Sequence, residues 1–504
     1  MVAKVFAQGD LVAVVGAGAM GAGIAHVAAA AGHTVLLYDQ KEGAAAEGVT
    51  GIDRRLKNSV KKGKVSEAYR EQVLGRLVPV STLESLASAD LVIEAIIENL
   101  DIKKTLFAKL EELVSDSAIL ATNTSSFSVT ALAAGMKSPE RVVGMHFFNP
   151  APLMKLVEII SGQQTSEDVA DIVFSAAYLW GKRPVKAKST PGFIVNRVAR
   201  PYYYEAFRAW EEGAASPAVI DCALKVSGGF RMGPFELTDL IGQDVNSAVS
   251  RSIFDAYSHQ VRFAPSLFQE ELVAAGKLGR KTGHSIYNED ASLYAEGLCD
   301  APVNSVAISD EAGAAEPIFD LLKESGVDLI EDNTLPIGVI SCGGIFLALT
   351  DGRTATNRAQ LLGRPVVLFD YATDYGTAEI IFIALADQAT PEDKSAAVAF
   401  FQKLEKRVII IDDHPGMLAM RTIASLCNVA ADAARDKVAT PADIDTAMIY
   451  GVNYPSGPLA WADKIGASHV CSTLQNLAEA TGESKYSPSQ YIARRIAAGG
   501  SLAA

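Results

Sequence analysis

The sequence predicts an α/β fold: a Rossmann-type doubly wound sheet followed by an all-helical domain, then a degenerate α/β segment and a second all-helical domain. Short apolar runs alternate with helix-like stretches over residues 11–185, which is typical of a parallel sheet covered by helices. The alternation stops after Lys188, and residues 415–466 later repeat residues 191–242. We expect four domains, with bounds at 1–188, 189–300, 301–411 and 412–504.

Length and composition set the broad class. A chain of 504 residues is too long for one core, so several domains are expected. The composition is globular, with 49% hydrophobic and 21% charged residues. A net charge of -14 without a dominant basic block argues against a nucleic-acid partner.

The cysteines and the N-terminus indicate a cytoplasmic protein. Five cysteines are scattered without a CxxC pair, which favours reduced thiols over a disulfide framework or a metal site. The first ten residues lack the apolar core of a signal peptide, and we find no apolar run long enough to span a bilayer.

A glycine-rich turn follows the first apolar run, Leu11–Val15. Its glycines would allow a tight turn, close approach of backbone to a pyrophosphate, and packing of helix on strand, and the helix N-terminus would face the phosphates. A second apolar run ends at Asp39, whose carboxylate favours the ribose of NAD over a 2′-phosphate. The expected cofactor contacts here are Gly16, Ala17, Gly18, Ala19, Met20, Gly21 and Asp39. The alternative is a glycine-rich turn of some other α/β domain, but the strand, helix and acidic residue around it favour dinucleotide binding.

Residues 44–75 read as a basic helical stretch with two interpretations. A charge run is usually a solvated face, but one that faces the cofactor crevice would hold phosphates of a large anionic substrate. The basic residues are Arg54, Arg55, Lys57, Lys61, Lys62 and Lys64.

Further strands end in polar residues. Residues 89–97 form an apolar run that closes with Glu98, and a helix carrying Lys103 follows. Residues 118–122 form another run, ending in Asn123-Thr-Ser125-Ser126. Ligands bind at the carboxyl ends of strands in open α/β sheets, so this polar cluster is a candidate site. The alternative is that Ser125 or Ser126 is a helix N-cap.

The chemistry is expected in residues 141–160, which read as two apolar strands around a proline-containing loop. His146 ends the first strand and Glu158 lies on the second. If the strands lie side by side, the carboxylate fixes the imidazole tautomer and stabilises the imidazolium, as a general base requires. The alternative is a core histidine beside an unrelated surface glutamate.

Seven motifs in order across residues 11–287 resemble the 3-hydroxyacyl-CoA dehydrogenase family: GAGAMG, YD, IEAIIEN, NTSS, HFFNP with KLVEII, TPGFIVNR and GRKTG. The resemblance implies that His146 is the base and Glu158 its orienting partner, and that Ser125 and Asn196 contact substrate. It adds Glu98, Lys103, Ser125, Asn149 and Lys281 to the cofactor contacts, and it places Arg55 and Lys62 near coenzyme A.

The second half is a repeat that has lost this chemistry. Adding 224 to residues 191–242 aligns them without a gap to 415–466, with 16 of 52 positions identical. Asn196 then faces Met420, and residues 301–411 show an α/β rhythm without a GxGxxG motif. We expect Glu379 near the place of Glu158, and an apolar residue of 367–369 in place of the histidine. We also expect the two helical domains to form an internal pseudo-dimer, with a homo-oligomer of the chain as a further possibility.

The predicted function is NAD-dependent oxidation of a (3S)-3-hydroxyacyl-CoA thioester to the 3-oxoacyl-CoA. The long form with a second repeat resembles bacterial 3-hydroxyadipyl-CoA dehydrogenases of phenylacetate breakdown, with 3-hydroxybutyryl-CoA as the competing substrate. Two alternatives of other kinds are a dehydrogenase of free hydroxy acids and a non-catalytic NAD-binding scaffold.

Overall fold

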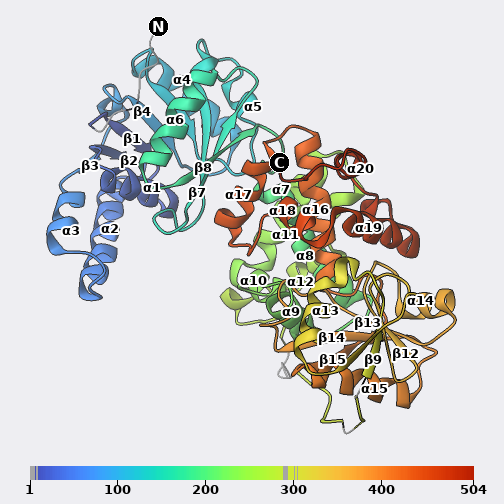
Figure 1. Ribbon diagram of the computed structural model, residues 1–504. Helices are drawn as coiled ribbons and strands as arrows, with labels where there is room; N and C mark the ends of the chain where they lie inside the picture. Colours follow the sequence, from blue (N-terminus) through green and yellow to red (C-terminus); the bar gives the residue numbers. More distant parts are fainter. Residues whose placement is uncertain (1–5, 7–8, 288–292, 300, 304) are drawn as a thin grey trace. The chain divides into compact units, whose positions relative to one another are not determined.

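A computed structural model describes residue 6 and residues 9–287, 293–299, 301–303 and 305–504 (Figure 1). This part of the chain forms two compact units. Unit 1 contains residues up to Arg197 together with Asp436–Val452, and unit 2 contains Val198–Arg435 and Asn453–Ala504. Residues 436–452 of the second copy belong to unit 1, and the four-domain division stays a prediction.

Unit 1 is built on an eight-stranded sheet of order β3-β2-β1-β4-β5-β6-β7-β8. All neighbours are parallel except β6 and β7, which run antiparallel. The strand order reverses between β1 and β4, which is the switch point where ligands bind in doubly wound sheets. The strands are β1 (Val12–Val15), β2 (Val35–Tyr38), β3 (Leu77–Val80), β4 (Leu91–Glu94), β5 (Ile119–Thr122), β6 (Val142–Phe147), β7 (Leu156–Ser161) and β8 (Arg183–Lys188).

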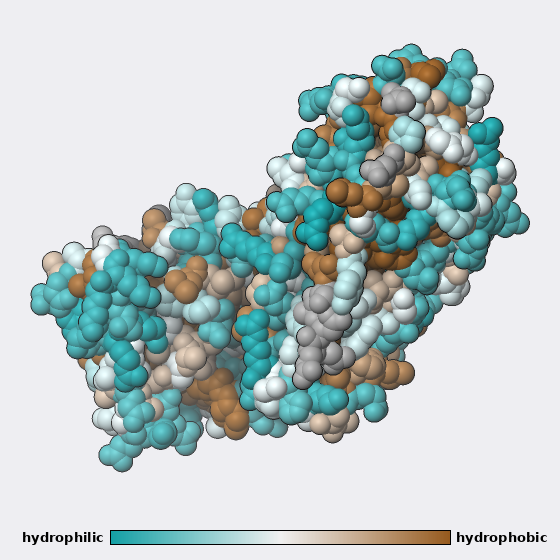
Figure 2. All heavy atoms as spheres, turned by 90° about the horizontal axis from the view of Figure 1, so that it is seen from below, coloured by the Kyte–Doolittle hydropathy of each residue, from teal (hydrophilic) through white to brown (hydrophobic). Residues whose placement is uncertain are grey.

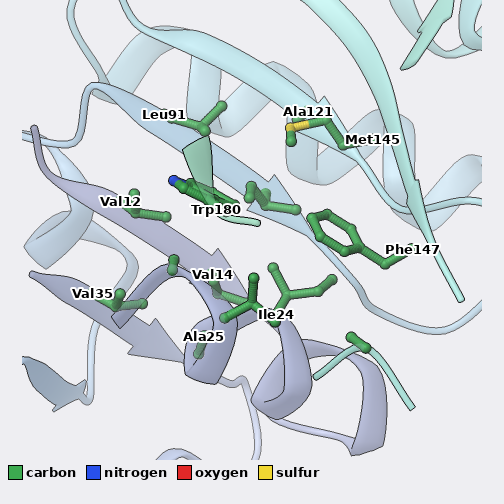
Figure 3. Close-up of a cluster of buried hydrophobic side chains, with 14 of the residues drawn as sticks. Val12, Val14, Ile24, Ala25, Val35, Leu91, Ala121, Met145, Phe147 and Trp180 are labelled. Carbon is green, nitrogen blue, oxygen red and sulfur yellow. The ribbon is translucent and has the colours of Figure 1, made fainter. Parts of the chain in front are cut away.

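The core of unit 1 forms because the central strands are apolar on both faces and must be covered by helices. Val14, Ile24 and Met145 are fully buried, and Figure 3 shows them beside Phe147 and Trp180. The helices of unit 1 are α1 (Ala19–Ala30), α2 (Ala44–Lys61), α3 (Glu67–Leu74), α4 (Leu100–Leu113), α5 (Val129–Ala133), α6 (Glu167–Leu179), α7 (Val195–Val198) and α17 (Pro441–Val452).

Unit 2 contains a seven-stranded mixed sheet of order β10-β9-β11-β12-β13-β14-β15. Three of its strand pairs are antiparallel, namely β9–β11, β11–β12 and β13–β14. The strands are β9 (Ser305–Ile308), β10 (Asp328–Glu331), β11 (Val339–Cys342), β12 (Ile345–Leu349), β13 (Val366–Phe369), β14 (Ile380–Leu385) and β15 (Arg407–Ile411).

Helices from both copies pack within unit 2. Helix α8 of the first copy contacts α16 of the second copy directly. The helices of unit 2 are α8 (Arg200–Glu211), α9 (Pro217–Val226), α10 (Pro234–Ile241), α11 (Gln243–Ala256), α12 (Leu267–Ala274), α13 (Glu316–Glu324), α14 (Ala355–Leu362), α15 (Pro391–Lys403), α16 (Ala419–Arg435), α18 (Pro458–Ile465), α19 (Ala467–Thr481) and α20 (Gln490–Ala497).

The repeat extends further upstream in the backbone than in the sequence. Adding 224 converts the bounds of β7 into those of β14, and the bounds of α6 into those of α15. Positions with positive φ also recur in pairs at this spacing: 181/405, 192/416, 193/417, 213/437, 229/453 and 242/466. The two copies therefore share turns as well as helices and strands.

Some expected elements differ from the structure. The basic stretch 44–75 is two helices, because Gly63 adopts a positive φ and Ser66 caps α3 by accepting a hydrogen bond from Tyr69 N–H. Strands β10, β12 and β14 were not expected as separate elements. In the part of the chain that the structure describes, no helix is long and apolar enough to cross a bilayer. Figure 2 shows one face, on which polar side chains predominate between scattered apolar ones.

Candidate active site

His146 and Glu158 lie directly opposite each other on the antiparallel strands β6 and β7. Nδ1 of His146 is 2.7 Å from Oε2 of Glu158, and both side chains are buried. The contact confirms the expected meeting of these side chains. Because the carboxylate accepts a hydrogen bond from Nδ1–H, Nε2 is the nitrogen left to accept a proton.

The second carboxylate oxygen of Glu158 is held by backbone. Oε1 accepts hydrogen bonds from the N–H groups of Ile194 and Val195, each at 3.0 Å. These N–H groups lie at the start of α7, where a helix has donors without internal partners and a positive dipole end. Glu158 is therefore fixed at both oxygens, and His146 is fixed through it.

Aromatic rings border the histidine. The ring centroid of Phe148 is 4.5 Å from that of His146, and the centroid of Phe193 is 5.9 Å away. Only 6% of His146 is exposed. Such an apolar setting strengthens the interaction between imidazolium and carboxylate once the base has taken up a proton.

The glycine-rich turn has the shape that a dinucleotide requires. Gly16 has φ +102°, and a Cβ there would lie 2.5 Å from the carbonyl oxygen of Ala95. A Cβ on Gly21 would lie 1.8 Å from the carbonyl oxygen of Gly16, whereas one on Gly18 would meet nothing within 4 Å. Gly18 is thus open where phosphate would approach, and the first turn of α1 holds no acidic residue.

Asp39 follows β2 and closes this turn. Its Oδ2 accepts a hydrogen bond from Ala17 N–H at 2.7 Å, and its Oδ1 accepts one from Lys41 N–H at 2.9 Å. The carboxylate is held at the carboxyl end of β2, where the acidic residue of a dinucleotide-binding site bonds the ribose. Ala19 and Met20 open α1 beside it.

A buried charge cluster lies beside the turn. The ammonium of Lys103 is 2.6 Å from Oε1 of Glu94 and 3.1 Å from Oε2 of Glu98, with Lys103 and Glu94 almost fully buried. The sequence analysis identified Glu98 and Lys103 but not Glu94. The available signal was a charged residue inside the apolar strand β4, because a buried charge needs a partner.

Glu98 links this cluster to the polar segment after β5. Its Oε1 accepts hydrogen bonds from the Thr124 hydroxyl, from Ser125 N–H at 3.1 Å and from the Ser126 hydroxyl at 2.9 Å. Burial raises the pKa of Glu98, but the hydrogen bond from Thr124 and the charge of Lys103 outweigh that effect and lower it below its ordinary value. Ser125 does not cap α5, since Ser128 accepts the capping bond.

The remaining expected contacts differ in setting. Asn149 is exposed on the loop between β6 and β7, and Asn196 is partly buried on α7, one residue after the N–H that holds Glu158. Arg55 and Lys62 are exposed at the C-terminal part of α2 and its end. Lys281 lies in unit 2, where it forms an ion pair with Asp244.

Two basic side chains near the dinucleotide turn, a partly buried histidine and a buried lysine, have lowered pKa values. Burial lowers the pKa of His26 on α1 to about 4, with contributions from Arg55 and Lys182. Burial also lowers the pKa of Lys182 to about 8, and its ammonium donates to the carbonyl oxygens of Ala151 and Met154. Through these two hydrogen bonds Lys182 holds the loop between β6 and β7, which follows His146.

The second copy carries different residues at the positions of the pair. By the spacing of 224, Asp370 takes the place of His146 and Phe382 the place of Glu158, and Asp370 N–H donates to the carbonyl oxygen of Phe382 at 3.0 Å. The expectation that Glu379 stands near the place of Glu158, with an apolar residue replacing the histidine, is wrong. The first residues of the two strands are 14 positions apart in both copies, so no gap shifts the alignment.

Comparison with known families matches most of this chain. The 3-hydroxyacyl-CoA dehydrogenase NAD binding domain matches residues 11–190, and the C-terminal domain of the same family matches 192–289 and 416–502. The 3-hydroxybutyryl-CoA dehydrogenase reduced Rossmann-fold domain matches residues 347–415.

Individual relatives agree with the family matches. The 3-hydroxyadipyl-CoA dehydrogenase of Escherichia coli K12 is 47% identical over 484 residues, which cover 96% of this chain and 97% of that protein. The mitochondrial hydroxyacyl-coenzyme A dehydrogenase of Sus scrofa is 43% identical over 282 residues, 55% of this chain and 90% of that protein. The crystal structure of 3-hydroxybutyryl-CoA dehydrogenase from Escherichia coli K12 superposes with a TM-score of 0.87 and 45% identity, covering 98% of this chain and 99% of that one.

Proposed function

We infer that this chain, which belongs to the 3-hydroxyacyl-CoA dehydrogenase family, oxidises (3S)-3-hydroxyacyl-CoA to 3-oxoacyl-CoA. The observation that carries the proposal is the buried His146–Glu158 pair, whose carboxylate is fixed at both oxygens. NAD, when bound, accepts the hydride from C3 of the substrate. The glycine turn and Asp39 fit this cofactor, since Gly18 leaves space for the pyrophosphate and Asp39 is held at the ribose position.

Residues of this chain supply the base, orient the substrate and bind the two nucleotides. Nε2 of His146 removes the hydroxyl proton, and Glu158 holds the ring and stabilises the imidazolium. Ser125 and Asn196 orient the hydroxyl and the thioester carbonyl, which supplies alignment. Glu98, Lys103 and Asn149 shape the nicotinamide side of the turn, and the family resemblance adds Lys281 to the proposed cofactor contacts. Arg55 and Lys62 offer positive charge to the phosphates of coenzyme A.

The test is the absorbance of NADH during reduction of acetoacetyl-CoA by the full chain. We expect turnover with the thioester and at least about a hundredfold less with free acetoacetate, because free acid leaves the coenzyme A contacts unused. Equal rates with both would favour a dehydrogenase of free hydroxy acids. No absorbance change with either, together with retained NADH binding, would favour a non-catalytic scaffold.

We propose 3-hydroxyadipyl-CoA or 3-hydroxybutyryl-CoA as the substrate. Support for the first is the relative of matching length that carries the adipyl name, and support for the second is the similar structure that carries the butyryl name. A panel of acyl-CoA thioesters separates the two: a higher kcat/KM for the dicarboxylic thioester assigns the adipyl substrate. Failure of a deletion strain to grow on phenylacetate would place the enzyme in that catabolism.

We also propose that the two helical copies form an internal pseudo-dimer. Support comes from reciprocal contacts within each unit: Lys188 N–H donates to the carbonyl oxygen of Val438, and Asp412 N–H donates to that of Ala214, which are equivalent pairs at a spacing of 224. In unit 2, Arg421 of α16 bonds Glu205 of α8 at 2.8 Å. Light scattering on a chain ending near Tyr287 should show self-association, and a well-behaved monomer would contradict the proposal.

We also propose that the protein is cytoplasmic. All five cysteines are free thiols, as expected in a reducing compartment. Fractionation of cells with an antibody to the chain tests it.

A further inference from the structure

Helix α17 lies on the strand that carries Glu158 although it comes from the second copy. Residues 436–452 belong to unit 1, and α17 contacts β7 and β8 there. The guanidinium of Arg183 on β8 lies over the ring of Tyr450, 5.8 Å from its centroid. The C-terminal half of the chain thus reaches the catalytic sheet itself.

Gly451 near the end of α17 touches the two residues next to the catalytic carboxylate. A Cβ on Gly451 would lie 2.5 Å from Cδ2 of Leu156 and 3.0 Å from Cγ2 of Val195. Leu156 shares a face of β7 with Glu158, because residues two apart on a strand point to the same side. Val195 provides one of the N–H groups that bond Glu158. A side chain at this position would therefore displace Leu156 and press on Val195.

The other end of the segment is anchored to the chain around α7. The guanidinium of Arg197, only 3% exposed, is 2.6 Å from the carboxylate of Asp436, and Lys188 N–H bonds the carbonyl oxygen of Val438 at 2.8 Å. Arg197 lies two residues beyond Val195. The segment is therefore tied on both sides of the backbone that holds Glu158.

Gly451 is the second-to-last residue of α17, and its close contacts with Leu156 and Val195 give a packing reason for its small size. The equivalent position in the first copy, at a spacing of 224, is Ser227 on the C-cap of α9. The glycine occurs where the segment packs on Leu156 and Val195, whereas the equivalent position of the first copy carries a serine.

We propose that residues 436–452 brace the His146–Glu158 pair, with Gly451 as a positioning residue that sets the distance between α7 and β7. The inference rests on the proposed function, because it assigns a role relative to that base. It gives the second half of the chain a part in catalysis without any group that touches substrate.

The test compares Gly451→Val with Ala442→Val, an exposed position on the first turn of the same helix, in the full-length enzyme. We expect Gly451→Val to lower kcat for acetoacetyl-CoA reduction roughly tenfold to a hundredfold, the scale of a misplacement of about 1 Å. NADH affinity should stay, and the high-pH limb of the kcat/KM profile for reduction should move, because His146 must be protonated to give its proton to the forming hydroxyl. Ala442→Val should leave both kcat and the profile unchanged.

Rescue distinguishes positioning from a general loss of packing. In Gly451→Val combined with Leu156→Ala the new side chain occupies the space of the removed one, and kcat should return to within about threefold of the parent, a coupling expected for contacting residues. Should Gly451→Val fail to fold, Gly451→Ala takes its place in the same comparison.

Parental kcat and pH profile in folded Gly451 variants would overturn the proposal. So would a loss that tracks the folded fraction alone and is not rescued by Leu156→Ala. Failure of the proposed function itself gives a different result, namely full activity in His146→Gln.

Discussion

The strand pair β6–β7 of the first copy and the strand pair β13–β14 of the second copy have the same backbone and different chemistry. In the first, Glu158 accepts the N–H groups of Ile194 and Val195 and also holds His146. In the second, Asp370 accepts the N–H groups of Leu418, Ala419 and Met420 at the equivalent helix start. Both copies place a carboxylate at this point.

The difference between the two copies separates what the backbone requires from what the proposed catalysis requires. A helix start has N–H donors without internal partners and attracts an anion. A carboxylate meets this requirement in both copies. In the first copy it is Glu158 on the second strand, β7, and in the second copy it is Asp370, directly after the first strand, β13. The histidine and the carboxylate beside it occur only in the first copy, because the backbone does not need them.

The largest expected effect is on the rate. His146→Gln or Glu158→Gln should lower turnover by about two to four orders of magnitude, the usual scale of general acid–base catalysis, with NADH affinity kept. The measurement is steady-state reduction of acetoacetyl-CoA. The matched control is Glu379→Gln, an exposed carboxylate of the second copy, which should keep the parental rate. Parental turnover in both first-copy variants would remove the contrast between the copies.

Next in size is the stability of the helix pairing. Arg421 is 1% exposed and bonds Glu205, Glu212 and the Tyr486 hydroxyl, so Arg421→Met leaves a buried carboxylate without its partner. We expect a loss of about 3–5 kcal/mol in the free energy of unfolding. The equivalent change Arg197→Met should cost less, because the carboxylate of Asp436 is 36% exposed. Urea unfolding of both variants measures the difference, and equal costs would contradict the account.

A pH dependence should follow from the second-copy carboxylate. Burial raises the pKa of Asp370 to about 6, although four backbone N–H groups bond to it. A carboxyl group whose pKa is higher in the folded chain contributes stability that is present at low pH and is lost as the pH rises through that value. Asp370→Asn should therefore cost more at pH 5 than at pH 8, by roughly 1–2 kcal/mol.

Denaturant unfolding of the parent and of Asp370→Asn at the two pH values measures this difference. A cost that rises with pH would mean that the ionised carboxylate is the form preferred by the helix start. The sign of the pH dependence shows whether the helix start prefers Asp370 protonated or as a carboxylate, the form in which Glu158 is proposed to act.

The smallest expected effect concerns the turns. Glu405 has φ +60° where the first copy has Gly181, and Lys437 has φ +54° where it has Gly213. Glu405→Gly and Lys437→Gly should each stabilise the chain by up to about 1 kcal/mol, because side chains in this region are strained. The reverse change Gly181→Glu should destabilise by a similar amount. Thermal unfolding checks the signs, and a stabilising Gly181→Glu would show that the turns are not equivalent.

Much of the fold and the site followed from the sequence. Periodicity and the Gly16–Gly21 turn predicted the Rossmann sheet, and the placement of His146 and Glu158 on adjoining strands predicted their contact. Glu94 was missed because the sequence pattern does not show which basic residue pairs with a single acidic residue in an apolar strand. The place of Asp370 was missed because alignment by residue type looks for a histidine, whereas the helix start requires an acceptor for its N–H groups.

The exchange of residues 436–452 into unit 1 was also beyond the sequence, because periodicity identifies a helix and does not say which sheet it covers. The structure adds a physical reason at Gly451, where a side chain would displace Leu156.

The measurement that tests the account most directly is the number of NADH molecules bound per chain, from fluorescence titration of the full-length protein at known concentration. The account predicts one, because the first copy alone has the glycine turn and the His146–Glu158 pair among the described residues. Two bound molecules per chain would contradict it, since the second copy would then hold a working dinucleotide site.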